Sequence, residues 1–362
     1  MSIEILTSLF TLKELFLIGI IFLLLFTVFL LLVYAVVLRV LFNTGNAFYR
    51  RRFSEWETLL LEYLAEPEKF RKFAAFKLQY RDWTRFGEFI ENYLVNLKGE
   101  DYDAIIHLLY QLMFNSMLMK AIDSSDNWHR TYAAYYLGLM KFRPAENKLR
   151  ALIFNKSPVQ SFIAFEAFSR IGSSKEIYKV LKFVLNSESL SYARVTDIVL
   201  SYGDGIVPDL IALLNDNNVR GKGKRLIIDV LVIRNAVEAL PVIKEMTYDT
   251  DDVEVIIGCI KAMGAFGGPE SIDFLMAHLS SPDWVLRSQA VRALGNVSSP
   301  EVIPELKMRI RTDMNYWVKL YSAQVLKKFG EGGIRELESI LTLNPGGDVS
   351  DIVNYVLHET EE

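Results

Sequence analysis

Four histidines and one cysteine supply the side chains from which most metal sites and nucleophilic centres are built. The histidines are His107, His129, His278 and His358. No two of them stand at ligand spacing, and no pair of cysteines accompanies them. We therefore expect scattered structural or surface histidines, and we predict no metal site, no cofactor and no catalytic residue.

Cys259 is the single cysteine, so the chain has no intrachain disulfide framework. It lies in the segment "VIIGCIKAMG", at a position that small residues hold in similar segments elsewhere in the chain. Those residues are Ala133, Ala164, Ala290 and Ser322. A buried structural thiol explains Cys259 without a nucleophilic role.

Two stretches contain the spacing Gly-x-Gly, "SYGDGIVPDL" (201–210) and "VRGKGKRL" (219–226). Neither is a nucleotide motif, because no third glycine follows at dinucleotide spacing and no strand pattern precedes them. Lys222 and Lys224 also lack the following Ser or Thr of a phosphate-binding loop. We therefore predict that the protein is not an enzyme.

The second of these stretches gathers four positive charges, Arg220, Lys222, Lys224 and Arg225. The glycines between them cost helix stability, so the stretch conflicts with the helical pattern around it. Such conflicts are typical of functional sites. Exposed amides and four positive charges would suit an acidic segment of a protein partner or a phosphate. The alternative is a degenerate, frayed turn in solvent, and the sequence leaves the two equally open.

A basic residue recurs eight positions before the end of similar helical segments: Arg130, Lys224, Arg287 and Lys319. These residues would form either a positive ladder for a ligand or structural pairs with neighbouring carboxylates. We favour the structural pairs.

A second basic group follows the longest apolar run of the chain. Residues 15–38 include no Asp, Glu, Lys or Arg, and a helix of 24 residues is long enough to cross a bilayer. A soluble core helix of this length would carry a polar face, and a signal peptide would be shorter, with a basic start and a small-x-small cleavage site. The sequence therefore predicts one retained membrane-spanning helix over residues 15–42.

The flanking charges predict which way this helix points. One lysine and two glutamates precede it, and four arginines follow it: Arg39, Arg50, Arg51 and Arg52. The positive-inside rule places the arginine side in the cytoplasm and the tail of residues 1–14 outside. These membrane-orienting arginines would also touch anionic lipid.

The remaining 300 or so residues carry no strand-like alternation, and helical spacing runs through nearly all of them. The chain has a formal net charge of −4 and a pI near 5.8, which gives no basic face for nucleic acid. Residues 43–46 (Asn-Thr-Gly-Asn) look like a short flexible joint, and Ser54 with Glu57 forms a capping box. Helices are expected over 68–80, 83–98 and 103–122.

From about residue 126 the sequence repeats every 31 or 32 residues. The end of one helix recurs at Gly138, Ser169, Leu200, Val232, Gly264, Gly295 and Lys327. Twelve positions earlier lie the expected helix starts: Asp126, Ser157, Glu188, Arg220, Asp252, Asp283 and Asn315. Three positions later, left-handed helix ends are expected at Gly172, Gly203, Asn235, Gly267 and Gly330. A second apolar helix follows in each copy, which predicts an α-solenoid of about seven helix pairs.

The phrases "AMGAFGGPE" (262–270) and "VRALGNVSSPEVIPEL" (291–306) resemble HEAT repeats of the short bacterial kind. With its anchor and helical lead-in, the chain resembles bacterial membrane-anchored HEAT-repeat proteins. The fold class is then all-α, with an N-terminal single transmembrane helix followed by the solenoid. The expected parts are a tail (1–14), the span (15–42), a linker and lead-in (43–103), the repeats (104–343), and a capping helix with an acidic tail (344–362).

Solenoids mostly bind other proteins along an extended surface. We expect a membrane-tethered scaffold or adaptor at the cytoplasmic face of the bacterial plasma membrane, with Arg220, Lys222, Lys224 and Arg225 as candidate contacts. The resemblance implies a membrane glycosyltransferase of polysaccharide synthesis as the partner. The alternatives are a HEAT-like enzyme of the chromophore-lyase type and a self-associating structural coat.

Overall fold

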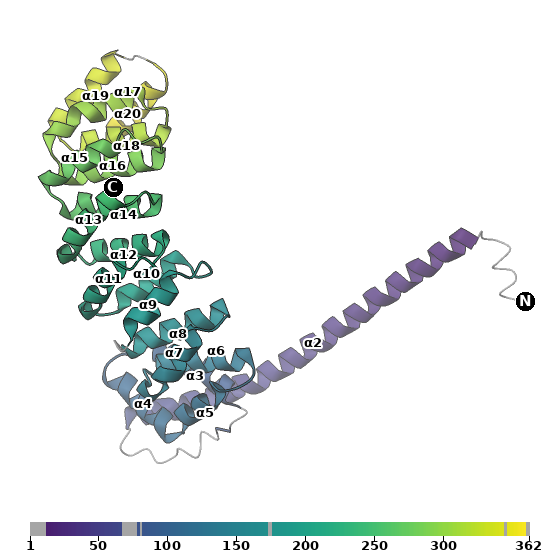
Figure 1. Cartoon of the computed structure of the whole chain (residues 1–362). Coiled ribbons are helices and arrows are strands. Elements are labelled where there is room, and N and C mark those ends of the chain that lie inside the picture. Colours follow the sequence, from purple (N-terminus) through teal and green to yellow (C-terminus); the bar gives the residue numbers. More distant parts are fainter. Residues whose placement is uncertain (1–11, 67–77, 80–81, 173–175, 344–345, 360–362) are drawn as a thin grey trace, which may run out of the picture. The chain divides into compact units, whose positions relative to one another are not determined.

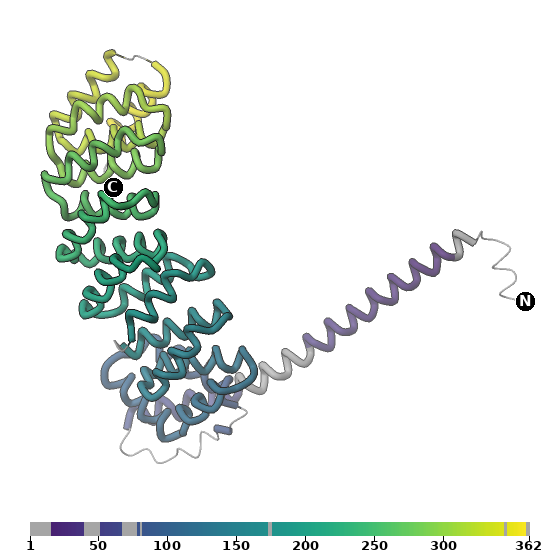
Figure 2. The backbone as a smooth tube through the Cα atoms, viewed as in Figure 1, coloured from purple at the N-terminus to yellow at the C-terminus, as the bar shows by residue number. Residues whose placement is uncertain are grey.

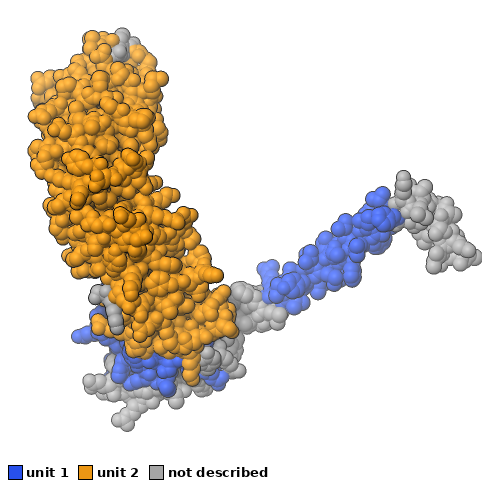
Figure 3. All heavy atoms as spheres, viewed as in Figure 1, with its two compact units in different colours: residues 1–117 blue, residues 118–362 orange. Residues whose placement is uncertain are grey.

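The structure is a computed structural model, and it describes residues 12–66, 78–79, 82–172, 176–343 and 346–359. Side chains are described within these ranges except at 12–15 and 40–50. The chain divides into two compact units, residues 1–117 and 118–362, which are coloured separately in Figure 3. Throughout the described residues the regular structure is helical, as the sequence predicts (Figure 1).

The first unit begins with one long helix, α2 (Leu12–Ala65) (Figure 1). Two expectations about this region are wrong. Residues 43–46 are not a joint, because α2 continues through them, and Ser54 does not start a helix, because it lies inside α2. The main-chain hydrogen bonds on both sides outweigh the modest helix cost of Asn and Gly. The helix does end just before Pro67, as expected.

Two shorter helices follow in this unit, α3 (Trp83–Asn96) and α4 (Glu100–Gln111), and α5 (Phe114–Ala121) contains the boundary between the two units. The helix expected over 83–98 is confirmed, while the one expected over 103–122 is two helices separated at Met113, where φ is +55°. The helix expected over 68–80 falls almost wholly outside the described residues. Aromatic rings form the core, with Trp56 of α2 set edge-on to Phe86 at 5.1 Å and Phe86 edge-on to Phe114 at 5.4 Å.

Seven helix pairs make up most of the second unit, and each runs out and back before the next begins (Figure 2). The first helices of the pairs are α6 (Asn127–Leu139), α8 (Pro158–Ile171), α10 (Tyr192–Ser201), α12 (Gly221–Ile233), α14 (Val253–Phe266), α16 (Trp284–Val297) and α18 (Tyr316–Lys327). The second helices are α7 (Glu146–Ile153), α9 (Ile177–Leu185), α11 (Val207–Leu214), α13 (Leu240–Asp249), α15 (Ile272–His278), α17 (Ile303–Thr312) and α19 (Glu331–Leu343).

Six of the seven expected helix starts are confirmed as N-caps. In four copies the side chain of the cap accepts a hydrogen bond from the second residue of the helix: Asp126, Asp252, Asp283 and Asn315. Glu188 is the exception, because α10 begins three residues later with Ser191 as its N-cap. The first helix of the third copy is therefore short, at 10 residues against 14 in α14 and α16.

The expected left-handed helix ends are confirmed at Gly172, Asn235 and Gly330, where φ is +71°, +54° and +69°. They are wrong at Gly203 and Gly267, where φ is −68° and −73°. After α14 the positive φ falls one residue later, at Gly268. At the end of α10 the guanidinium of Arg234 donates to the carbonyls of Leu200 and Tyr202 instead. Short 3₁₀ turns follow Gly203 and Gly268, at Asp204–Ile206 and Pro269–Ser271.

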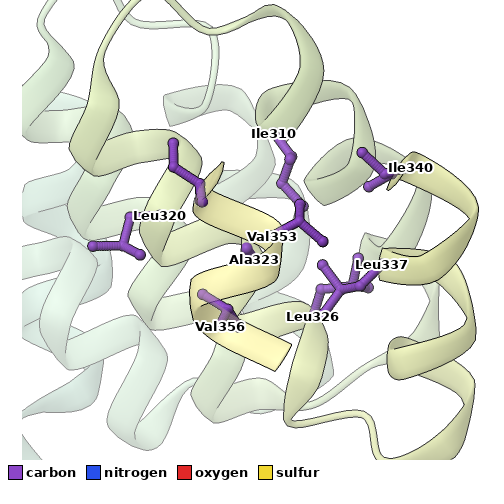
Figure 4. Close-up of a cluster of buried hydrophobic side chains, with 9 residues drawn as sticks. Ile310, Leu320, Ala323, Leu326, Leu337, Ile340, Val353 and Val356 are labelled. Atoms are coloured by element: carbon purple, nitrogen blue, oxygen red, sulfur yellow. The ribbon is translucent and has the colours of Figure 1, made fainter. Parts of the chain in front are cut away.

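Neighbouring first helices approach each other closely where a glycine faces a small residue. A Cβ atom on Gly138 would lie 2.5 Å from the Cα of Ala167, and one on Gly264 would lie 2.7 Å from the Cβ of Ala293. The stack ends with α20 (Asp348–His358), which places Val353 and Val356 against Leu326 and Leu337 (Figure 4). This last helix covers the apolar face that the seventh pair would otherwise expose.

Candidate protein-binding site

The basic stretch with its two arginines and two lysines (220–225) forms the start of α12. Arg220 is the N-cap residue, in extended conformation, and its side chain makes no capping bond. Its amide donates instead to Oδ1 of Asn186 at 2.9 Å, and its carbonyl accepts from the amide of Lys224 at 3.0 Å. The helix is therefore regular from Gly221 onward, and the interpretation as a frayed turn is wrong.

The two glycines of this turn are explained by close packing on both sides. A Cβ on Gly221 would lie 1.9 Å from Oδ2 of Asp252, the N-cap of α14. A Cβ on Gly223 would lie 2.9 Å from the carbonyl oxygen of Leu185, at the end of α9. Glycine fits here because the second copy, through Leu185, and the fifth copy, through Asp252, both press against the start of the fourth.

Arg220 and Arg225 are each paired with a carboxylate from an adjacent copy. Arg220 bonds Glu188, and both side chains are largely exposed, at 62% and 84%. Arg225 is half-buried and bonds Glu254 of α14. Burial alone would lower the pKa of the Arg225 guanidinium, but Glu254 raises it above its ordinary value. These two positive charges are therefore largely balanced within the fold.

Arg225 also borders a polar chain that links α10, α12 and α14. The hydroxyl of Tyr192 donates to Oδ2 of Asp229 at 2.5 Å, and Nζ of Lys261 donates to Oδ1 of the same carboxylate at 3.0 Å. The guanidinium of Arg225 lies 6.0 Å from the ring centroid of Tyr192. Burial, and then the hydrogen bond to Asp229, raises the pKa of Tyr192, so its hydroxyl remains protonated and serves as a donor.

Lys222 and Lys224 differ from the two arginines. Among the residues that the structure describes, neither lysine has a carboxylate oxygen within 4 Å of its ammonium group. Lys222 is exposed and Lys224 is half-buried. The structure thus divides the four basic residues into a paired set and a set whose charge is open to another molecule.

Two clefts flank the start of α12. The larger, about 410 Å³, is lined mainly by apolar side chains from α9, α10 and α12, with Glu188 and Lys222 at its polar edge. The smaller, about 340 Å³, lies toward the fifth copy, and its lining includes Lys224 together with Glu245, Asp249 and Asp252. Both volumes fall in the range of small-ligand or peptide side-chain pockets. For brevity we call them the apolar cleft and the acidic cleft.

Two of the basic residues that recur along the repeats, Arg287 and Lys319, form structural pairs with carboxylates, as favoured from the sequence. Arg287 donates to both oxygens of Asp313, at 2.7 and 2.8 Å, and to the carbonyl of Ser281 at 2.9 Å. Burial would raise the pKa of Asp313, but the bonds from Arg287 and from the amide of Asn315 bring it below its ordinary value. Lys319 bonds Asp348 of α20. These pairs join successive elements of the stack.

Arg130 differs in detail, because it donates to the carbonyl of Ser124 at 3.0 Å and to the side chain of Asn127. It therefore secures the loop before α6 through neutral acceptors. The predicted pairing with a carboxylate does not describe this copy.

Each of three histidines has a partner on its own helix or at its own helix start. His107 lies 2.8 Å from the side chain of Gln111, His129 bonds the cap Asp126, and His278 lies 2.8 Å from the carbonyl of Phe274. Cys259 is fully buried, and burial raises the pKa of its thiol to about 12. Within the described ranges no three side chains of His, Cys, Asp or Glu form a group suited to a metal ion.

The apolar part of α2, Phe16–Arg39, is 24 residues long, and its most apolar window is entirely exposed. By length and composition it could cross a membrane or act as a signal sequence. Of the four membrane-orienting arginines, the side chain of Arg50 lies outside the described residues, and Arg39 and Arg51 are not buried. Arg52 has a packing role, since it lies 3.3 Å from Asp82 and 5.5 Å from the ring of Trp56.

Sequence reasoning missed the acidic partners of the basic stretch, although a signal for them was present. Glu188 precedes Arg220 by 32 residues, and Asp229 precedes Lys261 by the same interval. This interval equals the repeat period, so opposite charges one period apart predict contacts between adjacent first helices. Arg225 and Asp229 are also one helical turn apart and lie 3.9 Å from each other.

Comparison with known proteins supports the repeat architecture. Residues 240–327 match the family model of HEAT repeats, which covers the copies with the best-formed caps. The chain therefore contains HEAT repeats, within an all-α solenoid that is preceded by one apolar N-terminal helix among the described residues. No curated protein matches it.

Solved structures with similar helix arrangements cover most of the chain. The complex of CpcE and CpcF of phycocyanin lyase from Nostoc sp. is 18% identical, with a TM-score of 0.33, over 67% of this chain and 93% of that chain. The YibA protein of Escherichia coli is 14% identical, with a TM-score of 0.36, over 78% and 94%. Human deoxyhypusine hydroxylase in complex with glycerol is 15% identical, with a TM-score of 0.29, over 76% and 96%. These resemblances concern the arrangement of helices alone.

Proposed function

We propose that the protein is a membrane-tethered scaffold or adaptor that binds a protein partner at the cytoplasmic face of the bacterial plasma membrane. The observation that carries this proposal is the pairing of an exposed 24-residue apolar helix with a stack of helical repeats in one chain. The exposed apolar surface of Phe16–Arg39 requires a nonpolar environment, and a membrane supplies one.

The proposed orientation places the N-terminus outside and the repeats in the cytoplasm. Arg39 and residues 50–52 support it through the positive-inside rule. The packing of Arg52 against Trp56 and Asp82 leaves fewer arginines for the lipid surface, so we propose that Arg39, Arg50 and Arg51 carry most of the orienting effect.

Arg220, Lys222, Lys224 and Arg225 form the proposed partner-binding stretch, and we propose a membrane glycosyltransferase of polysaccharide synthesis as the partner. A non-catalytic role is supported by the state of the single thiol. Cys259 is buried and its raised pKa keeps it protonated at neutral pH, which makes it a poor nucleophile.

Two measurements test the proposal. A C-terminal alkaline phosphatase fusion should be inactive and a C-terminal fluorescent protein fusion should be bright; the reverse pattern would overturn the cytoplasmic placement. Purification of the full chain in mild detergent should recover a membrane enzyme. Recovery of further copies of this chain alone would favour a coat, and attachment of a bilin to an added phycobiliprotein by the purified chain would favour a lyase.

A further inference from the structure

We infer that the apolar cleft binds a peptide segment in which a bulky apolar side chain stands next to an aspartate or glutamate. This inference rests on the proposed scaffold function and names the chemistry of the partner segment. It follows from the way α10 begins, from the charges around the cleft, and from the contrast with the acidic cleft on the other side of α12.

The cleft exists because the third copy departs from the repeat. The helix α10 starts at Tyr192, so residues 188–190 form a turn and a bend where the other copies already have helix. Asn186 fixes this loop to the next copy, since its side chain donates to the carbonyl of Asn218 at 2.7 Å and accepts from the amide of Arg220 at 2.9 Å. The loop is held in place without filling the space above α12.

Most of the side chains that line this space are apolar. Its lining includes Val184, Leu185, Leu190, Tyr192, Val195 and Leu226. The volume of about 410 Å³ admits a large side chain such as Leu, Phe or Trp. Tyr192 is 40% exposed and is held by its bond to Asp229, so it offers a fixed ring face to an incoming side chain. An apolar anchor is therefore the group that this cleft can desolvate at least cost.

The edge of the cleft carries one uncompensated positive charge. Glu188 is paired with Arg220, and Arg225 with Glu254, so these charges largely cancel. Lys222 remains, exposed at the edge and without a carboxylate within 4 Å among the described residues. A carboxylate beside the apolar anchor would meet this ammonium group, and that charge complementarity selects an acidic neighbour over a basic one.

The charges that line the acidic cleft explain why such a segment would bind on the other side of α12, in the apolar cleft. In the acidic cleft Lys224 shares the lining with Glu245, Asp249 and Asp252, so the carboxylates outnumber the ammonium group. An acidic segment would be repelled from that cleft and attracted to the one at Lys222. The two clefts thus differ in the sign of the charge that they favour, although they share one helix start.

The test is a selection of peptides from a random display library on the full chain held in lipid nanodiscs. The selected peptides should share a large apolar residue next to Asp or Glu. Labelled copies of them should bind the Lys222→Glu variant about tenfold or more weakly than the unchanged protein. Replacing the acidic residue of the peptide by lysine should restore binding to that variant. Lys222 is exposed and makes no core contact, so the variant should fold normally.

The matched control is Lys156→Glu, which reverses another exposed lysine just before the start of a first helix, α8. This variant should bind the peptides as the unchanged protein does. The inference is overturned if no peptide is selected, if the selected peptides lack the acidic and apolar pair, or if Lys222→Glu binds them equally well. The scaffold function is judged separately: a partner that co-purifies equally with Lys222→Glu would reject the cleft and leave the scaffold standing.

Discussion

The fifth to seventh repeats and the third and fourth repeats follow the same plan with different consequences. In α14, α16 and α18 a side chain caps each helix, and Gly264 of α14 and Gly295 of α16 lie against Ala293 and Val325 of the next first helix. In α10 and α12 neither cap makes a side-chain bond, and two clefts open beside them. Regular packing leaves little space between copies, whereas the displaced start of α10 borders the apolar cleft. Local departures from a repeat are therefore the places to look for binding sites in this stack.

The largest effect is expected when an ion pair is broken. We compare a buried pair of the regular repeats, Arg287 with Asp313, with an exposed pair of the irregular ones, Arg220 with Glu188. Arg287 and Asp313 are 13% and 2% exposed, so Arg287→Ala leaves a buried carboxylate without its partner and should cost about 3–5 kcal/mol of unfolding free energy. Arg220→Ala, at an exposed pair, should cost less than about 1 kcal/mol. Denaturant unfolding of the full chain in detergent, followed by circular dichroism, measures both. Equal losses would show that the two regions do not differ in this respect.

A second pair of changes compares core leucines. Leu294 is fully buried, so Leu294→Ala should leave a cavity and cost about 2–5 kcal/mol. Leu226 is 4% exposed and lines the apolar cleft, so Leu226→Ala enlarges an existing space and should cost clearly less. The melting temperatures of the two variants make the comparison. A larger loss at Leu226 would mean that the cleft is closed in solution.

A third comparison concerns glycines. The Cβ of Gly264→Ala would lie 2.8 Å from the Cα of Ala293, which is main chain and cannot turn away, so the change should cost about 1–3 kcal/mol. Gly203 has φ of −68° and no atom within 4 Å of its Cβ position. Gly203→Ala should therefore be neutral or stabilise by up to about 1 kcal/mol. Chemical denaturation distinguishes the two, and a neutral Gly264→Ala would argue against close contact between α14 and α16.

The smallest expected effect concerns the caps. Asp283 accepts from the amide of Val285 at 2.8 Å, so Asp283→Ala should cost about 1 kcal/mol. Ser191 makes no capping bond, and Ser191→Ala should change stability by less than about 0.5 kcal/mol. Hydrogen exchange of the first amides of α16 and α10 reports each change locally. Faster exchange in α10 on loss of the Ser191 hydroxyl would show a cap that forms only in solution.

Most of the fold follows from local sequence signals, and most of the site does not. The period of the repeat and its cap residues predicted six helix starts, because a cap is decided by one side chain and two amides. The helix start predicted at Glu188 was wrong because spacing alone cannot tell which residue of "SESLS" (187–191) caps the helix. The flexible joint predicted at residues 43–46 was wrong because the free-energy cost of Asn and Gly in a helix is small compared with the stabilisation from the helical hydrogen bonds on either side.

The candidate site depends on contacts between copies, which composition does not reveal. The sequence presented Arg220, Lys222, Lys224 and Arg225 as one positive cluster. The structure gives two of them carboxylate partners at distances in sequence close to one period, as with Glu188 for Arg220. Charges aligned by period could have been predicted, but the clefts could not, because their volume depends on how side chains from three helices fill the same space.

Because α2 is unbroken, its length fixes a rotation as well as a distance. Each residue of an α-helix advances the chain by about 100° around the helix axis. The number of residues between Phe16 and Trp56 therefore fixes the angle, measured around this axis, between the apolar stretch and the aromatic core of the first unit. One residue inserted near position 44 would rotate that core by about 100° about the helix axis, and seven would return it to within about 20°. The number of residues in this segment therefore fixes the direction in which the aromatic core faces, as well as its distance from the apolar stretch.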